Sequence, residues 1–138
     1  MFKRMIICLL LSMSAGMSLQ AQERMTDILL PVERYFSNGD VDSLSRWFAE
    51  ALDVTIFSRS NESSSNQARQ ILQTFFNIYT PHECKISHVV DKNNIEYALG
   101  YLKAGGQNFM ISLFISKQDS TCVIQQVKIE KSSVNRNR

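Results

Sequence analysis

The residues best suited to chemistry are two histidines and a few amide, acidic and aromatic side chains within apolar patterns. His88 shares the alternation of Cys84 and Ile86, which predicts that the three side chains lie on one face of a strand. A histidine there could act as a general base if a partner and a substrate were within reach. The alternative is a buried or rim histidine that hydrogen-bonds to the backbone or to a tyrosine.

Amide and aromatic side chains define a candidate cavity. Gln125 lies between Val123 and Val127 in an alternating stretch, which predicts an inward-facing amide. Such an amide either satisfies groups of the sheet itself or contacts a ligand. The aromatic side chains of Trp47, Tyr97 and Tyr101 form either cavity walls or plain core. The candidate cavity comprises Trp47, Phe75, His88, Tyr97 and Gln125.

Several reaction types lack the residues that they need. Asp53 adjoins an apolar stretch, but its place at the start of a strand predicts exposure. His82 and His88 have no acidic residue at ligand spacing, so we expect no metal site. No nucleophile has a base nearby, and Gly105-Gly106 fits a hairpin turn rather than a phosphate loop. We therefore assign no catalytic, cofactor-binding or metal-binding residue and expect no cofactor.

The segment from Glu83 to Glu130 predicts the sheet that positions these residues, because apolar and polar side chains alternate along it. Turn-forming residues occupy positions 91–94, 104–107 and 117–120, and such short connections make neighbouring strands antiparallel. Cys84 and Cys122 then fall on the first and fourth strands, about 14 Å apart. A disulfide needs Cα atoms within about 7 Å, so we expect two free thiols.

Amphipathic stretches upstream predict three helices. The first begins near Ile28 and ends at Asn38-Gly39, and the third opens with a capping box at Ser64 and ends before Pro81. The second has an apolar stripe at helical spacing, formed by Leu44, Trp47, Phe48 and Ala51. Residues 54–57 are interpreted as a short strand and residues 58–63 as a polar loop.

This order of elements predicts an α+β fold, in which three N-terminal-side helices pack on a curved antiparallel sheet. A short strand lies between the second and third helices, and a four-strand meander forms the C-terminal half.

A family resemblance supports this fold. The order of elements resembles the nuclear transport factor 2-like (cystatin-like α+β) superfamily. More closely, the stretch from Leu44 to Glu130, with VTIF, NQARQILQTFF, ISHV, YALGYL and IQQVKIE, is similar to a family of small secreted bacterial proteins known only as a domain of unknown function. The resemblance implies a curved sheet around a conical cavity, but no catalytic residue, since that family has no assigned activity. Cys84 departs from the pattern, because a large apolar residue is expected there.

Residues 1–21 have the features of a secretory signal peptide. Lys3 and Arg4 precede an apolar run from Met5 to Leu11, much shorter than the roughly 20 residues that span a bilayer. Removal of residues 1–21 takes away Lys3 and Arg4 and thus the net charge of +2, so the mature chain would be neutral. A neutral chain argues against nucleic acid as a partner. We expect an exported protein, periplasmic or secreted, with no integral membrane segment after cleavage. The α+β domain would cover residues 22–130, followed by a disordered basic tail, 131–138.

These observations favour a non-enzymatic module that binds a small apolar ligand or another protein. The alternative is a small-substrate enzyme of isomerase or dehydratase type, which would need a carboxylate or histidine inside the cavity. Tyr97 and Tyr101 alternate with Ala98 and Leu102, so the sheet is apolar on both faces. An exposed apolar face often marks an interface, which predicts a homodimer through the outer sheet face unless helices and tail cover it.

Overall fold

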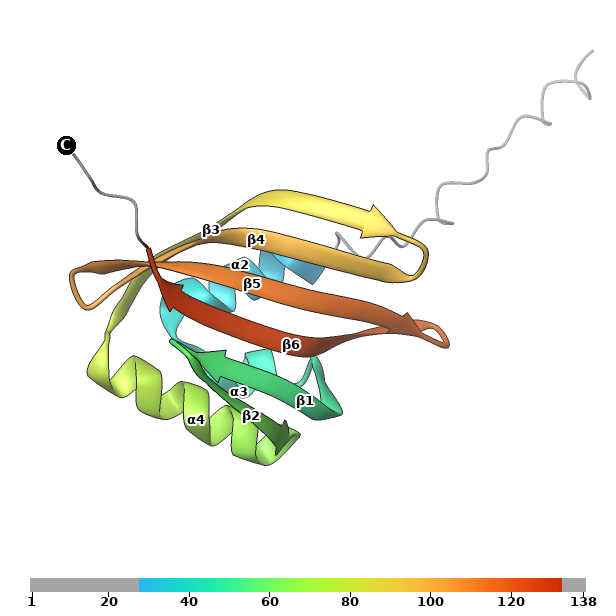
Figure 1. Ribbon diagram of the computed structural model, residues 1–138, viewed down its shortest axis with the longest axis horizontal. Helices are drawn as coiled ribbons and strands as arrows, with labels where there is room; N and C mark the ends of the chain where they lie inside the picture. Colours follow the sequence, from blue (N-terminus) through green and yellow to red (C-terminus); the bar gives the residue numbers. More distant parts are fainter. Residues whose placement is uncertain (1–27, 133–138) are drawn as a thin grey trace, which may run out of the picture.

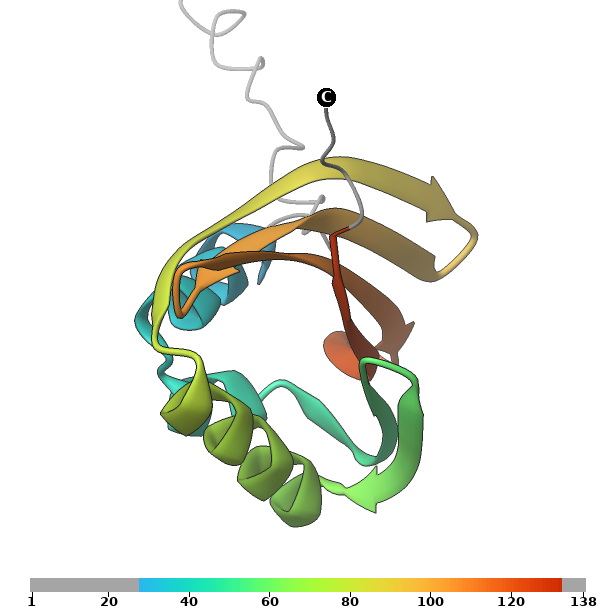
Figure 2. The ribbon, with the colours of Figure 1, turned by 60° about the vertical axis from the view of Figure 1, so that its left-hand side comes forward.

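The computed structural model describes residues 28–132, and one curved sheet wraps around the helices of this part of the chain (Figure 1). Figure 2 shows the helices lying on the concave side. The helices are α2 (Leu29–Asn38), α3 (Val41–Ser45) and α4 (Ser65–Ile78). The strands are β1 (Phe48–Ile56), β2 (Arg59–Ser64), β3 (Pro81–Lys92), β4 (Ile95–Ala104), β5 (Gln107–Gln118) and β6 (Thr121–Lys131).

The described residues do not include the expected signal peptide, residues 1–21, or residues 133–138 of the expected tail. Lys131, the first residue of that tail, belongs to β6. None of the described helices is long and apolar enough to cross a membrane.

The six described strands form one mixed sheet in the order β2-β1-β6-β5-β4-β3. The meander from β3 to β6 is antiparallel, as predicted. The prediction of a fully antiparallel sheet is wrong, because β1 runs parallel to β6. This pairing joins segments far apart in the sequence, which alternation within each strand does not reveal.

The second predicted helix is a helix only in its first part and a strand in its last part. α3 ends at Ser45, and β1 begins at Phe48, where a helical stripe was expected to continue. The Trp47 carbonyl accepts a 2.7 Å hydrogen bond from the N–H of Ile124 on β6, next to the Phe48–Ile124 pair. The backbone bonds to β6 therefore override the helical spacing of the apolar residues.

The predicted polar loop at 58–63 is also wrong, since most of it forms β2, antiparallel to β1. β2 is an edge strand, and all but one of its residues are exposed. Polar side chains suit that position, because they keep an exposed edge from pairing with other chains. The predicted short strand at 54–57 is the end of β1, and Phe57 belongs to the turn.

The other helix boundaries follow the sequence signals. Gly39 adopts the left-handed conformation after α2, with φ of 69°. At the start of α4, Ser64 and Gln67 form the predicted capping box through hydrogen bonds of 3.0 and 3.1 Å. α2 covers β3, and α4 lies beside β1 and β2 (Figure 1).

A β-bulge in β3 overturns the prediction that His88 faces inward. Ile86 pairs with Gly100 and His88 with Leu99, so Ser87 is an extra residue. Beyond the bulge the alternation changes side, and His88 is exposed. Its Nδ1 lies 3.4 Å from the Ser87 hydroxyl oxygen.

A second bulge changes the faces of β6. Gln125 is the extra residue there, because Ile124 pairs with Ile115 and Gln126 with Phe114. Ile124 is buried before the bulge, and Val127 and Ile129 are buried after it. Val123 and Gln125 are only partly buried, so the predicted inward row through Val123, Gln125 and Val127 is wrong.

Candidate functional site

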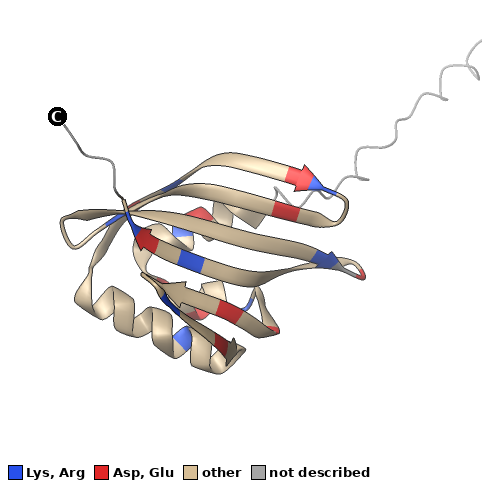
Figure 3. Cartoon of the chain, in the orientation of Figure 1, with Lys and Arg blue, Asp and Glu red and all other residues tan. Residues whose placement is uncertain are grey.

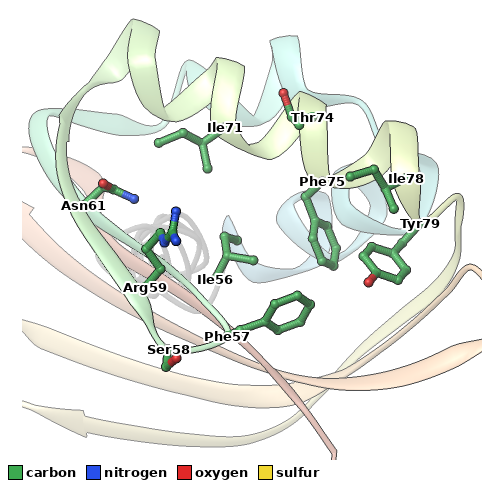
Figure 4. Close-up of a pocket in the computed structure, with 10 residues that line it drawn as sticks. All are labelled: Ile56, Phe57, Ser58, Arg59, Asn61, Ile71, Thr74, Phe75, Ile78 and Tyr79. Carbon is green, nitrogen blue, oxygen red and sulfur yellow. The ribbon is translucent and has the colours of Figure 1, made fainter.

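A pocket of about 550 Å³ lies between the β1–β2 hairpin and α4 (Figure 4). We call it the hairpin–helix pocket. Its volume falls within the range of small-molecule sites, roughly 300–1,000 Å³. It is lined by Ile56, Phe57, Ser58, Arg59, Asn61, Ile71, Thr74, Phe75, Ile78 and Tyr79.

The wall from α4 follows from its sequence spacing. Ile71, Phe75 and Tyr79 are four residues apart, which places them along one side of the helix. The same helix buries Ala68 and Leu72 in the core. α4 therefore contributes to the core and to the pocket from adjacent faces.

The wall from the hairpin depends on an unusual backbone conformation. Phe57 has a φ of 63°, a left-handed value that is rare for a bulky side chain. Its N–H donates a 2.7 Å hydrogen bond to the carbonyl of Ile129, and the Nζ of Lys131 lies 5.5 Å from the centre of its ring. Contacts with β6 thus hold the ring at the pocket, against a strain of about 1–3 kcal/mol.

An aromatic cluster forms the apolar end of the pocket. The ring centres of Phe75 and Tyr79 are 4.9 Å apart, and the ring of Phe57 lies 6.2 Å from that of Phe75. Behind them, Phe109 of β5 is fully buried and lies 5.3 Å from Phe75. Mutual packing of these rings stabilises the wall by about 0.5–1.5 kcal/mol per pair beyond the area that they bury.

The opposite end of the pocket is polar. Figure 4 shows Arg59 and Asn61 on one side and the rings of Phe57, Phe75 and Tyr79 on the other. Arg59 and Asn61 share a face of β2 because they are two residues apart in a strand. A second hollow of about 430 Å³ adjoins this end and shares Asn61, Ile71 and Thr74 with the pocket.

Sequence comparison places the chain in a family. The family model for a domain of unknown function, DUF4783, matches residues 30–130. The chain belongs to the DUF4783 family. The predicted resemblance is thereby confirmed. No protein of curated function matches the chain.

Solved structures show the same fold. A DUF4783 family protein from Bacteroides uniformis ATCC 8492 is 21% identical, with a TM-score of 0.70 over 75% of this chain and 95% of the other. One from Bacteroides fragilis YCH46 is 25% identical, with a TM-score of 0.69 over 73% and 95%. An NTF2-like protein of unknown function from Cytophaga hutchinsonii ATCC 33406 is 9% identical, with a TM-score of 0.60 over 83% and 95%.

Only one of the five predicted cavity residues lines the hairpin–helix pocket of this DUF4783 protein, and that is Phe75. Trp47 is partly buried and packs against the core. Tyr97 lies on the outer face, 37% exposed, with its ring 6.3 Å from that of Phe114. His88 lies after the bulge at Ser87 and is turned from the core face, and Gln125 is itself the extra residue of the other bulge.

The pocket residues missed from the sequence are Phe57, Arg59 and Tyr79. Residues 58–63 contain no apolar side chain, so they show no alternation of apolar and polar residues that would predict a strand. The available signal was the alternation of Arg59 and Asn61, which becomes informative only when β2 is known to pair with β1.

A buried carboxyl group was missed as well. Glu96 is fully buried on β4, on the face shared with Ala98 and Leu102. The signal available in the sequence was the even spacing of Glu96 from those two residues, which places all three side chains on one face of the strand. It does not line the hairpin–helix pocket.

The thiol of Cys84 is unreactive near neutral pH. It is buried on β3, whereas Cys122 lies on β6, with β5 and β4 between the two strands. No disulfide joins these two cysteines in the described part of the chain, as predicted. Burial, followed by the charges of Glu33 and Glu83, raises the pKa of Cys84 from 9.0 to about 12. Because the reactive species is the thiolate, Cys84 is no nucleophile near neutral pH.

The pocket has the volume of a small-molecule site, but its described lining offers little for proton transfer. Histidine, cysteine, aspartate and glutamate are absent from the residues that line it. Within residues 28–132, no three such side chains are grouped so that they could hold a metal ion.

Proposed function

We propose that this DUF4783 protein binds a small apolar molecule in the hairpin–helix pocket and does not transform it. The observation that carries the proposal is an aromatic wall left open to solvent. Phe57 and Tyr79 are only partly buried, and Ile78 is 66% exposed at the same site. A ligand would cover this surface, and removal of apolar area from water favours binding by about 25 cal/mol per Å².

The isomerase or dehydratase alternative has weaker support. It needs a carboxylate or a histidine inside the cavity, and the described lining contains neither. Asp53 and His88 are both exposed, on β1 and β3, with three strands between them. Strand spacing places them about 19 Å apart, too far to form a catalytic pair.

Calorimetry with 1-octanol tests the proposal on the mature chain. We expect saturable binding that is lost in Thr74→Trp, which fills the pocket from the exposed side of α4. Gln73→Trp is the matched control, because it places the same ring on α4 at an exposed position that does not line the pocket. Absence of octanol binding to the wild-type chain, or equal loss in both variants, would overturn the proposal.

We also propose that the protein is exported and begins near Gln22. The support is the order of Lys3, Arg4, the apolar run and the small residues that end at Ala21. Mixed charges on the domain fit a soluble product, since Figure 3 shows positive and negative residues interspersed along the strands and helices. Mass spectrometry of the product decides the matter, and an intact Met1 or a lipid adduct would refute it.

A second copy of the chain is the proposed partner of the outer sheet face. The outer-face patch consists of exposed apolar side chains on β3, β4 and β5: Val90, Ile95, Tyr97, Tyr101 and Met110. Pairing of two such patches about a two-fold axis would remove them from water. Sedimentation at micromolar concentration should show a dimer that Tyr97→Lys weakens. A monomer in the wild-type protein would remove this proposal.

A further inference from the structure

We infer that the ligand of the hairpin–helix pocket is a single-chain amphiphile with a carboxylate headgroup, which Arg59 binds. This inference rests on the proposed function and names the class of its ligand. The apolar chain would contact the aromatic end of the pocket. The headgroup would lie at the polar end, near solvent.

Arg59 has unused capacity to bind an anion. Its guanidinium carries five N–H donors, and in residues 28–132 it takes part in none of the ion pairs or side-chain hydrogen bonds. Arg69, on the neighbouring helix, instead contacts Asp42 at 3.2 Å. Figure 4 shows the Arg59 side chain extending into the space between Ile56, Ile71 and Asn61. Two parallel N–H donors match the two oxygens of a carboxylate.

The surroundings of Arg59 favour a negative headgroup. Asn61 adds an amide on the same side of the pocket, and Lys131 lies near the other end, over the ring of Phe57. No acidic residue is among those that line the pocket, and the adjoining hollow has one, Glu62. Glu62 follows Asn61 in β2, so its side chain alternates away from the face of Arg59.

The pocket is apolar at one end and polar at the other, which favours an amphiphile over a uniformly polar anion. Its residues beyond Arg59 and Asn61 are mostly apolar, and they include three aromatic rings. A volume of about 550 Å³ suits one short acyl chain rather than the surface of a bilayer. We therefore commit to a free carboxylic amphiphile rather than a membrane lipid.

Three probes with the same alkyl chain separate the contribution of the headgroup from that of the apolar chain. They are octanoate, 1-octanol and octylammonium, titrated calorimetrically at pH 7. We expect octanoate to bind roughly threefold to tenfold more tightly than octanol, because an exposed ion pair is partly screened by water. Octylammonium should bind most weakly. Added salt should weaken the binding of octanoate but not of octanol.

Arg59→Gln supplies the decisive comparison. We expect it to remove the preference for octanoate over octanol, measured as the ratio of the two dissociation constants. Arg46→Gln is the control, since Arg46 is also exposed and does not line the pocket. It should keep the preference.

The outcomes distinguish this inference from the proposed function. If octanol binds and octanoate binds no more tightly, the headgroup inference fails and the pocket proposal stands. If neither binds, both fail. Retention of the octanoate preference in Arg59→Gln would also overturn the inference, as would saturable sedimentation with phosphatidylglycerol vesicles by a protein that does not bind octanoate.

Discussion

The Glu33 carboxylate of α2 accepts a 2.6 Å hydrogen bond from the backbone N–H of Ile86 on β3. One helical turn further, the Ser37 hydroxyl accepts a 2.8 Å bond from the N–H of Cys84. β3 is an edge of the sheet, so without α2 these donors would be open to another strand. Two side chains of α2 thus fix the helix to the sheet and protect part of its edge.

Replacement of Glu33 should loosen this attachment. We expect Glu33→Ala to lower the free energy of unfolding by about 1–3 kcal/mol, because a partly buried N–H loses a charged acceptor. Urea denaturation measures the change. Arg34→Ala is the control, since Arg34 is an exposed neighbour on the same helix. Equal losses in the two variants would show that the bond to Ile86 contributes nothing specific.

The raised pKa of Cys84 predicts a loss of stability in alkali. The unfolded chain releases the thiol proton above about pH 9, whereas the folded chain retains it to about pH 12. The unfolded state then binds fewer protons, so the free energy of unfolding falls as pH rises through this window. From pH 8 to pH 10, wild type should lose about 1.4 kcal/mol relative to Cys84→Ala, which lacks the thiol. A constant difference between the two proteins would contradict the raised pKa.

Gly100 is required by the close approach of β3 at its bulge. A Cβ at Gly100 would collide with the carbonyl oxygen of Lys85 and lie 2.8 Å from the Cα of Ile86. These are backbone atoms, so Gly100→Ala should cost about 1–3 kcal/mol of unfolding free energy. Gly106→Asn is the comparison, because nothing lies within 4 Å of that position and Asn tolerates its φ of 77°. A larger loss in Gly106→Asn than in Gly100→Ala would refute this explanation.

The parts of the fold that depend on local signals could be predicted from the sequence. The capping box at Ser64, the stop at Gly39 and the turns of the meander depend on residues close to one another in the chain. The α+β class followed from them. The boundary between α3 and β1 did not, because it depends on the pairing of Phe48 with Ile124, 76 residues away in the sequence.

The candidate site was harder to predict, because a β-bulge adds one residue to a strand and so changes which face the following side chains take. The bulges at Ser87 and Gln125 moved His88 and Gln125 out of the row that faces the core. Neither Ser87 nor Gln125 has a glycine or proline next to it that would signal the bulge. Phe75 lines the hairpin–helix pocket, and its place on α4 follows from the uninterrupted helical period.

The most direct test of the proposed pocket is an NMR titration of the isotopically labelled mature protein with 1-octanol. Backbone amide shifts report where the ligand lies, independently of affinity. We expect saturable shifts concentrated in residues 56–61 of the hairpin, residues 71–78 of α4 and Tyr79, which directly follows α4. Saturable shifts confined to the outer-face patch, or none in the hairpin and α4, would contradict the proposed binding site.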